Sequence, residues 1–125
     1  MSFVLTVCID GPLERMNIAV SWTDGLAVVT TPGEIDITNA GLLRAALLSA
    51  LEKPPPAIVV DMADTDFCDS TGLNVLVRVQ KQAAEQGTAL RLVIRAAAVQ
   101  RMLTVTGVSE LFRVYDTLAA ALQPD

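Results

Sequence analysis

A single-domain α/β fold with a mixed, mostly parallel β-sheet is the architecture that three features of this sequence predict. Short apolar runs typical of buried strands alternate along the chain with longer segments in which apolar residues recur at helical spacing. The pair Asp24-Gly25 separates the first two strand-like runs, which is typical of a hairpin turn. The chain has 125 residues, a length that fits one domain. Because strands that alternate with helices are joined by right-handed crossovers, the sheet should become parallel after its opening antiparallel hairpin.

The first half of the chain is expected to form that hairpin, one helix and one central strand. The β-prone runs 16–21 and 26–31 are the two strands of the hairpin. A helix should begin near Thr38, which is a plausible N-cap, and the three prolines at 54–56 cannot extend it. The run 57–60 is apolar at every position, as expected of a strand buried on both faces.

The second half repeats the alternation of helices and strands. A helix is expected over residues 70–86 and a strand over 89–94, followed by a helix over 96–104. A short strand at 112–115 and a last helix at 117–122 complete the domain. The order is therefore β, β, α, β, α, β, α, β, α, with about four helices.

Composition excludes several classes of function. Apolar residues make up 52% of the chain, yet charged residues interrupt every apolar stretch well before the roughly 18 positions needed to cross a bilayer. The apolar N-terminal segment lacks the basic start and the cleavage pattern of a secretory signal, so we expect a cytoplasmic protein without membrane insertion. The formal charge is −5 and no basic cluster is present, which argues against nucleic acid as a partner.

The two cysteines have no metal-ligand spacing and are expected to be reduced thiols in a cytosolic chain. We interpret Cys68 as a small, buried or half-buried apolar residue rather than a redox sensor. No P-loop or glycine-rich dinucleotide turn is present, so neither a cofactor nor a metal is expected.

Ser70 is the candidate regulatory residue. It lies in the segment Asp69-Ser70-Thr71-Gly72, which follows a strand-like run and opens a helix-like one. A nucleophilic serine normally needs an adjacent base, commonly histidine, and this chain contains no histidine. The free amides and the dipole at a helix N-terminus favour a phosphate. The sequence therefore predicts a phosphorylation switch at Ser70 and no enzymatic activity.

Three segments of the chain resemble the STAS domain family. Residues 33–36, with Asn39 and Ala40 beyond them, are similar to the signature that follows the family's second strand. Residues 69–73 resemble its phosphoserine motif, and residues 105–116 resemble its closing segment. Each motif alone is weak, but the three occur in the family's order and separation.

The resemblance covers about residues 16–122 and implies a STAS-like fold for residues 16–125. It says nothing about the N-terminal extension, residues 1–15, whose role stays open and which has room for an additional strand. Within the family, the chain looks like a stand-alone anti-sigma factor antagonist. The resemblance then implies that it binds an anti-sigma factor serine kinase and frees a sigma factor, with no cofactor of its own.

The resemblance also implies roles for individual residues. Ser70 is the phosphoacceptor, Asp69 flanks it, and Gly72 lets a partner approach the helix start. Asp36 matches a family position that contacts the kinase. The implied partner-binding residues are Asp36, Asn39, Asp69, Ser70, Thr71 and Gly72. Phosphorylation of Ser70 would end the interaction, and a protein phosphatase acting on phospho-Ser70 would restore it.

Other interpretations of the same residues stay open. Ser70 could serve only as the N-cap of its helix, and Asp36 could merely begin a turn. The chain could be a STAS binding module of a stress-sensing complex or of a lipid-transport complex. Asp61 lies about where a receiver domain accepts phosphate, and Asp64 with Asp66 suggests an aspartate-dependent phosphatase, but the metal-binding acidic residues and the lysine that both classes need are missing.

Overall fold

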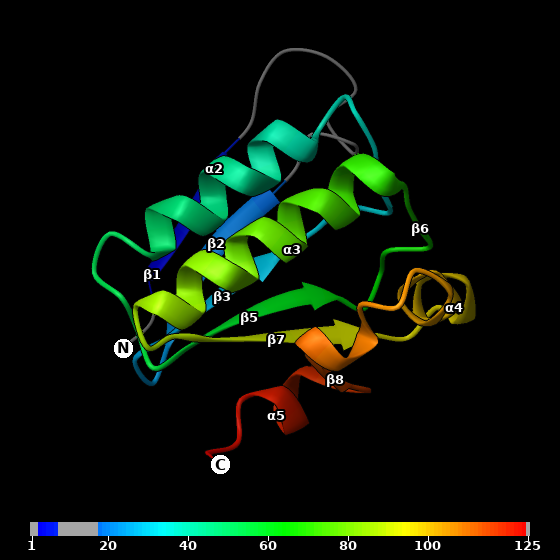
Figure 1. Ribbon diagram of the computed structural model, residues 1–125. Coiled ribbons are helices and arrows are strands. Elements are labelled where there is room, and N and C mark those ends of the chain that lie inside the picture. The colour runs from blue at the N-terminus through cyan, green and yellow to red at the C-terminus, as the bar shows by residue number, and fades with distance from the viewer. Residues whose placement is uncertain (1–2, 8–17, 125) are drawn as a thin grey trace.

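A mixed six-stranded sheet runs through the computed structural model, which describes residues 3–7 and 18–124 (Figure 1). Its strands lie in the order β1-β2-β3-β5-β7-β8. They are β1 Phe3–Val7, β2 Ile18–Thr23, β3 Leu26–Thr30, β5 Ala57–Met62, β7 Ala89–Ile94 and β8 Arg113–Tyr115. The pairs β1/β2 and β2/β3 are antiparallel, whereas β3/β5, β5/β7 and β7/β8 are parallel. The predicted mixed, mostly parallel sheet with an opening hairpin is confirmed.

The hairpin between β2 and β3 closes through the predicted turn. Thr23 pairs with Leu26, so the loop has only two residues, Asp24 and Gly25. Both have positive φ angles, 51° and 82°, as the tightest hairpin turns require. Residues 16 and 17 of the predicted first strand lie outside the described residues. So do 1–2 and 8–15 of the N-terminal extension, of which residues 3–7 form β1 at the edge of the sheet.

Four α-helices are present in the described part of the chain, as predicted. They are α2 Ala40–Ala50, α3 Ser70–Glu85, α4 Ala97–Val105 and α5 Leu118–Ala121, with a 3-10 turn, η1, at Ser109–Leu111. Figure 1 shows α2 and α3 side by side over one face of the sheet and α5 on the opposite side. The main core lies under α2 and α3, and Leu47, Leu76, Ile58 and Leu92 belong to its single buried cluster.

A second, two-stranded sheet was not predicted as a pair. β4 Glu34–Ile35 and β6 Phe67–Cys68 pair in parallel, with Ile35 opposite Cys68. Two residues are too few to show an alternating pattern, so a sequence cannot reveal such strands by periodicity. This small sheet holds together the loops that precede α2 and α3, and it positions the candidate site.

Candidate docking and phosphorylation site

Ser70 is the first residue of α3 and its side chain is exposed. The N-cap of the helix is Asp69, whose carboxylate accepts hydrogen bonds from the amides of Thr71 (2.9 Å) and Gly72 (3.2 Å). The interpretation of Ser70 as the cap is therefore wrong. No residue in the described part of the chain is hydrogen-bonded to the Ser70 hydroxyl.

The Asp69 carboxylate is stabilised in its charged form. The pKa of Asp69 lies below its usual value, first because the Thr71 hydroxyl donates a hydrogen bond to it. Desolvation opposes this effect, and hydrogen bonds from the backbone amides of Gly72, Thr71 and Ile37 lower the pKa further. Asp69 is consequently ionised at neutral pH, immediately beside the serine.

Removal of this cap should destabilise the protein moderately. We expect Asp69→Ala to lower the free energy of unfolding by about 1 kcal/mol, because two helix amides lose their acceptor. Thermal unfolding should then occur about 4 °C lower, given the unfolding entropy of a chain of this length. Asp66→Ala is the matched control, since Asp66 is an exposed carboxylate of the same loop that caps no helix. An equal loss in both variants would contradict the capping role.

Two backbone hydrogen bonds set the register between the loops of the site. The amide of Asp66 donates to the carbonyl oxygen of Gly33 (2.8 Å), and the amide of Asp69 donates to that of Ile35 (3.0 Å). In a strand, alternate side chains point to opposite faces. Because Ile35 and Cys68 are buried, the next residues, Asp36 and Asp69, are placed beside each other toward the outside.

A buried hydroxyl pair reinforces the same junction. The Thr65 hydroxyl donates to the carbonyl oxygen of Pro32 (2.6 Å) and lies 2.7 Å from the hydroxyl of Thr31. Thr65 is fully buried and Thr31 nearly so. These contacts join the segments that follow β3 and β5, so the loops carrying Asp36 and Ser70 share one support.

The loop before α2 is organised by Asp36 and Asn39. The carboxylate of Asp36 accepts hydrogen bonds from the amide (2.9 Å) and from the hydroxyl of Thr38. Asn39 is the N-cap position of α2, so the prediction that Thr38 caps this helix is wrong. The side-chain nitrogen of Asn39, Nδ2, donates a hydrogen bond to the carbonyl oxygen of Glu34 (2.8 Å). The side-chain oxygen, Oδ1, accepts a hydrogen bond from the backbone amide of Asp36 (2.9 Å).

The burial of Asn39 changes how its implied role is understood. Its side chain is 0% exposed, whereas Asp36 is half-buried. In this conformation the Asn39 side chain cannot touch a partner directly. Its hydrogen bonds instead fix the backbone on both sides of Asp36, so we assign Asn39 to the support of the loop rather than to its contact surface.

Gly72 makes a close approach within the chain itself. It is buried, and a Cβ atom at this position would lie 2.5 Å from Cγ2 of Ile35 and 2.7 Å from Sγ of Cys68. The close approach that Gly72 permits in this structure is a contact within the chain. Only glycine lets the first turn of α3 pack directly on the β4/β6 sheet.

Cys68 is buried as interpreted, with 6% of its surface exposed. Burial raises its pKa to about 12, and the nearby charge of Asp69 adds to the rise. The thiol is therefore neutral at physiological pH. Cys8, the other cysteine, lies outside the described residues.

This raised pKa makes Cys68 unreactive in the folded protein. We expect iodoacetamide at pH 8 to label Cys68 only after unfolding, because the thiolate is the reacting species. Peptide mass mapping distinguishes Cys68 from Cys8. Since the folded-state pKa exceeds the ordinary value of 9.0, the contribution of the neutral thiol to stability should be complete below pH 9 and decline as the pH rises toward 12. Rapid labelling of native Cys68 would contradict this environment.

Two exposed apolar residues at the site were missed by the sequence reasoning. Ile37 is 78% exposed and Phe67 is 50% exposed, although both lie in segments that contribute to the core. Alternation could have identified Phe67, because the adjacent Cys68 occupies the inward position. Alternation would place Ile37 on the same side as the buried Ile35, and Ile37 is exposed because β4 ends at Ile35 and the chain turns. An apolar rim therefore accompanies the acidic residues around Ser70.

The alternative phosphoacceptor or catalytic residues, Asp61 and Asp64, have few hydrogen-bond partners or are exposed. Asp61 is half-buried at the end of β5, where its carboxylate accepts a hydrogen bond from the amide of Ala63 (3.2 Å), and Asp64 is exposed. Among residues 3–7 and 18–124, no group of three or more histidine, cysteine or acidic side chains could hold a metal ion. Within the same residues, no helix combines the length and the hydropathy needed to span a membrane.

Comparison with known proteins relates the whole region to one family. The model of the STAS domain family matches residues 17–121. The anti-sigma-F factor antagonist RsfB of Mycobacterium tuberculosis is 28% identical over 109 residues, which cover 87% of this chain and 88% of the relative. The anti-sigma-B factor antagonist of Bacillus subtilis is 28% identical over 80% of this chain and 91% of its own.

A solved structure extends the similarity to the fold. The crystal structure of an anti-sigma factor antagonist from Mycobacterium paratuberculosis matches with a TM-score of 0.76 and 29% sequence identity. The match covers 96% of this chain and 92% of that chain. The residues matched by the family model include both Asp36 and Ser70.

Proposed function

This chain belongs to the STAS domain family, and from that membership we propose that it is an anti-sigma factor antagonist controlled by phosphorylation of Ser70. It binds an anti-sigma factor that is a serine kinase and thereby frees a sigma factor. Its relatives that are named anti-sigma factor antagonists support the class of function. The kinase as partner and the modification of Ser70 are our inference from the site.

The observation that carries this proposal is the exposed and uncommitted hydroxyl of Ser70. Asp69 supplies the cap of α3, so the helix does not need the serine side chain. A phosphate on Ser70 would lie at the positive end of the helix dipole, which favours a negative charge. The fold should therefore tolerate the modification, and the surface should change instead.

The phosphate would stay on the surface rather than become bound by the helix end. The amides of Thr71 and Gly72 already donate to Asp69. Phosphorylation adds about −1.5 to −2 charges beside an ionised carboxylate. A kinase site that modifies Ser70 must also hold the phosphates of its nucleotide near the hydroxyl. The product and that site would repel each other, which provides a physical reason for release.

The other residues of the site either contact the kinase or hold the contact surface in place. Asp36 lies beside Asp69 on the outer side of the β4/β6 sheet, and we propose that it contacts the kinase together with Ser70. Thr71 holds the Asp69 carboxylate, and its own hydroxyl is committed to that bond. Asn39 and Gly72 shape the loop and the helix start from inside. A phosphatase that removes the phosphate from Ser70 would restore the binding surface.

Incubation with an anti-sigma serine kinase of the same organism and ATP, followed by mass mapping, tests the proposal. We expect one phosphate, on Ser70, and its loss on treatment with a serine phosphatase. Thr71 should stay unmodified because its hydroxyl donates to Asp69. A kinase that binds the chain but modifies only Thr38 or Thr71, or an absence of any modification or binding, would refute the proposed switch.

A further inference from the structure

Two turns of the same construction flank the small β4/β6 sheet. One is Asp36-Ile37-Thr38 and the other is Asp69-Ser70-Thr71. In each turn the aspartate carboxylate accepts hydrogen bonds from the amide and the hydroxyl of the threonine two residues later. The amide distance is 2.9 Å in both. In each turn the middle residue, Ile37 or Ser70, is exposed.

The two turns also lie side by side. They follow paired strands in equal register, since Ile35 is opposite Cys68 and Ile37 and Ser70 each come two residues later. The amide of Asp69 donates to the carbonyl oxygen of Ile35 (3.0 Å), which carries the pairing up to the turns. The backbone amide of Ile37 also contributes a hydrogen bond to the Asp69 carboxylate, which places Ile37 beside the start of α3.

The side chain of Ile37 is not part of the hydrophobic core. Ile37 is 78% exposed, the largest exposure among the large apolar residues of the described chain. An isolated exposed apolar residue is ordinary, but this one is next to the hydroxyl that an enzyme must reach. A specific protein interface covers about 800 Å² on each partner, far more than the area between the two turns.

We propose that Ile37 is the apolar anchor through which the kinase acting on Ser70 recognises this protein. The inference rests on the proposed function and adds a specificity-determining residue to it. Residues of the two turns have different roles in recognition. Ile37 supplies contact area that is independent of modification, and Ser70 supplies the charge that changes. The partner surface should accordingly offer an apolar pocket beside its nucleotide site.

Steady-state phosphorylation of Ile37→Ser tests the anchor. We expect KM for the protein substrate to rise about tenfold, a typical loss for truncation of an interface anchor, with kcat unchanged. Ile37→Val, which keeps most of the apolar area, should recover most of the wild-type KM. Both variants should fold normally, because the side chain is exposed.

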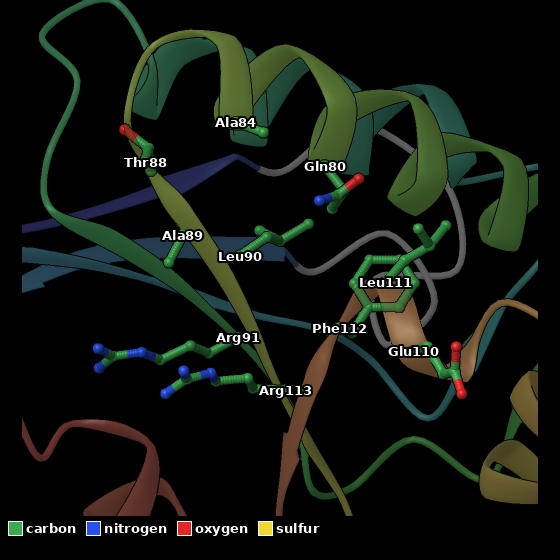
Figure 2. A pocket seen from close by; sticks show the side chains of 10 residues that line it. All are labelled: Gln80, Ala84, Thr88, Ala89, Leu90, Arg91, Glu110, Leu111, Phe112 and Arg113. Atoms are coloured by element: carbon green, nitrogen blue, oxygen red, sulfur yellow. The ribbon is translucent and has the colours of Figure 1, made fainter. Parts of the chain in front are cut away.

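Leu111→Ser is the matched control at a distant site. Leu111 is 39% exposed and lines a pocket with Gln80 and Ala84 of α3, as Figure 2 shows. Gln80 is ten residues beyond Ser70, which corresponds to about 15 Å along the helix. Loss of an apolar side chain there should leave KM unchanged.

The outcomes separate the two proposals. Wild-type protein that is modified at Ser70, together with an unchanged KM for Ile37→Ser, would overturn the anchor and leave the switch standing. A wild-type protein that is not modified at Ser70 would overturn both. A wild-type dimer in light scattering that Ile37→Ser converts to monomer would assign Ile37 to contact between copies and would also overturn the anchor.

Discussion

The protein phosphorylated at Ser70 is expected to bind the kinase about a hundredfold more weakly than the unmodified protein. The Ser70→Asp variant should bind at least about tenfold more weakly than the unmodified protein. Ser70→Ala should bind as tightly as the wild type, because no hydrogen bond of the described chain depends on this hydroxyl. The alanine variant should also be insensitive to ATP. The three forms thus separate the effect of charge from that of the side chain itself.

The expected magnitude follows from like charges at a close contact. Two unit charges about 6 Å apart in an environment of effective dielectric near 20 repel by roughly 3 kcal/mol, which corresponds to about a hundredfold in affinity. Salt weakens the repulsion where the contact is exposed. A carboxylate carries less charge than a phosphate, so Ser70→Asp should reproduce only part of the effect.

Isothermal titration calorimetry at two salt concentrations measures these differences. Gln82→Glu is a suitable control, since it adds one negative charge to the exposed side of α3 about 18 Å along the helix from Ser70. Its affinity should match that of the wild type. Equal kinase affinity for wild type, Ser70→Ala, Ser70→Asp and the phosphorylated form would count decisively against the switch.

The large elements could be predicted because their patterns extend over many residues. The apolar run at 57–60 and the helical spacing after Ser70 each indicated the correct element, and the pair Asp24-Gly25 indicated the hairpin. Each of the two long elements has residues buried along its length, so its apolar residues form a pattern that can be recognised in the sequence. The fold class and the order of the larger elements followed from these patterns, whereas the two-residue strands β4 and β6 did not.

The details of the helix ends could not be predicted in the same way. Asp36, Thr38 and Asn39 are all residue types that cap helices well, and propensity does not separate them. The structure assigns the N-cap position to Asn39, whose side chain bonds to the backbone of Glu34 and Asp36 rather than to the helix amides. At the start of α3, Asp69 and Ser70 are likewise both good capping residues, and the structure has Asp69 as the cap.

Tertiary contacts decided the roles that the sequence left open. A buried asparagine and a surface asparagine look alike in one sequence, so the burial of Asn39 emerged only with its two loop partners in place. Ile37 lies between acidic and polar residues, where an apolar side chain suggests the core. Only the pairing of β4 with β6 shows that it lies beside Ser70.

Substitution of Gly72 tests whether the contact between α3 and the β4/β6 sheet supports the site. We expect Gly72→Ala to lower the free energy of unfolding by about 2 kcal/mol, because the new Cβ would overlap Ile35 and Cys68 in a packed region. The gain in helix propensity offsets at most about 1 kcal/mol of the steric cost. Thermal unfolding should shift down by about 8 °C.

Gly41→Ala provides a control of opposite sign. Gly41 lies in the first turn of α2, and a Cβ at this position would meet no atom within 4 Å. The substitution should raise stability by up to about 1 kcal/mol, since alanine restricts the unfolded chain and favours the helix. The two variants make the same chemical change at the start of neighbouring helices, so their difference isolates the contact with Ile35 and Cys68. If both variants gained stability, the β4/β6 sheet would be free to move away from α3, and the fixed alignment of Ile37 with Ser70 would lose its physical basis.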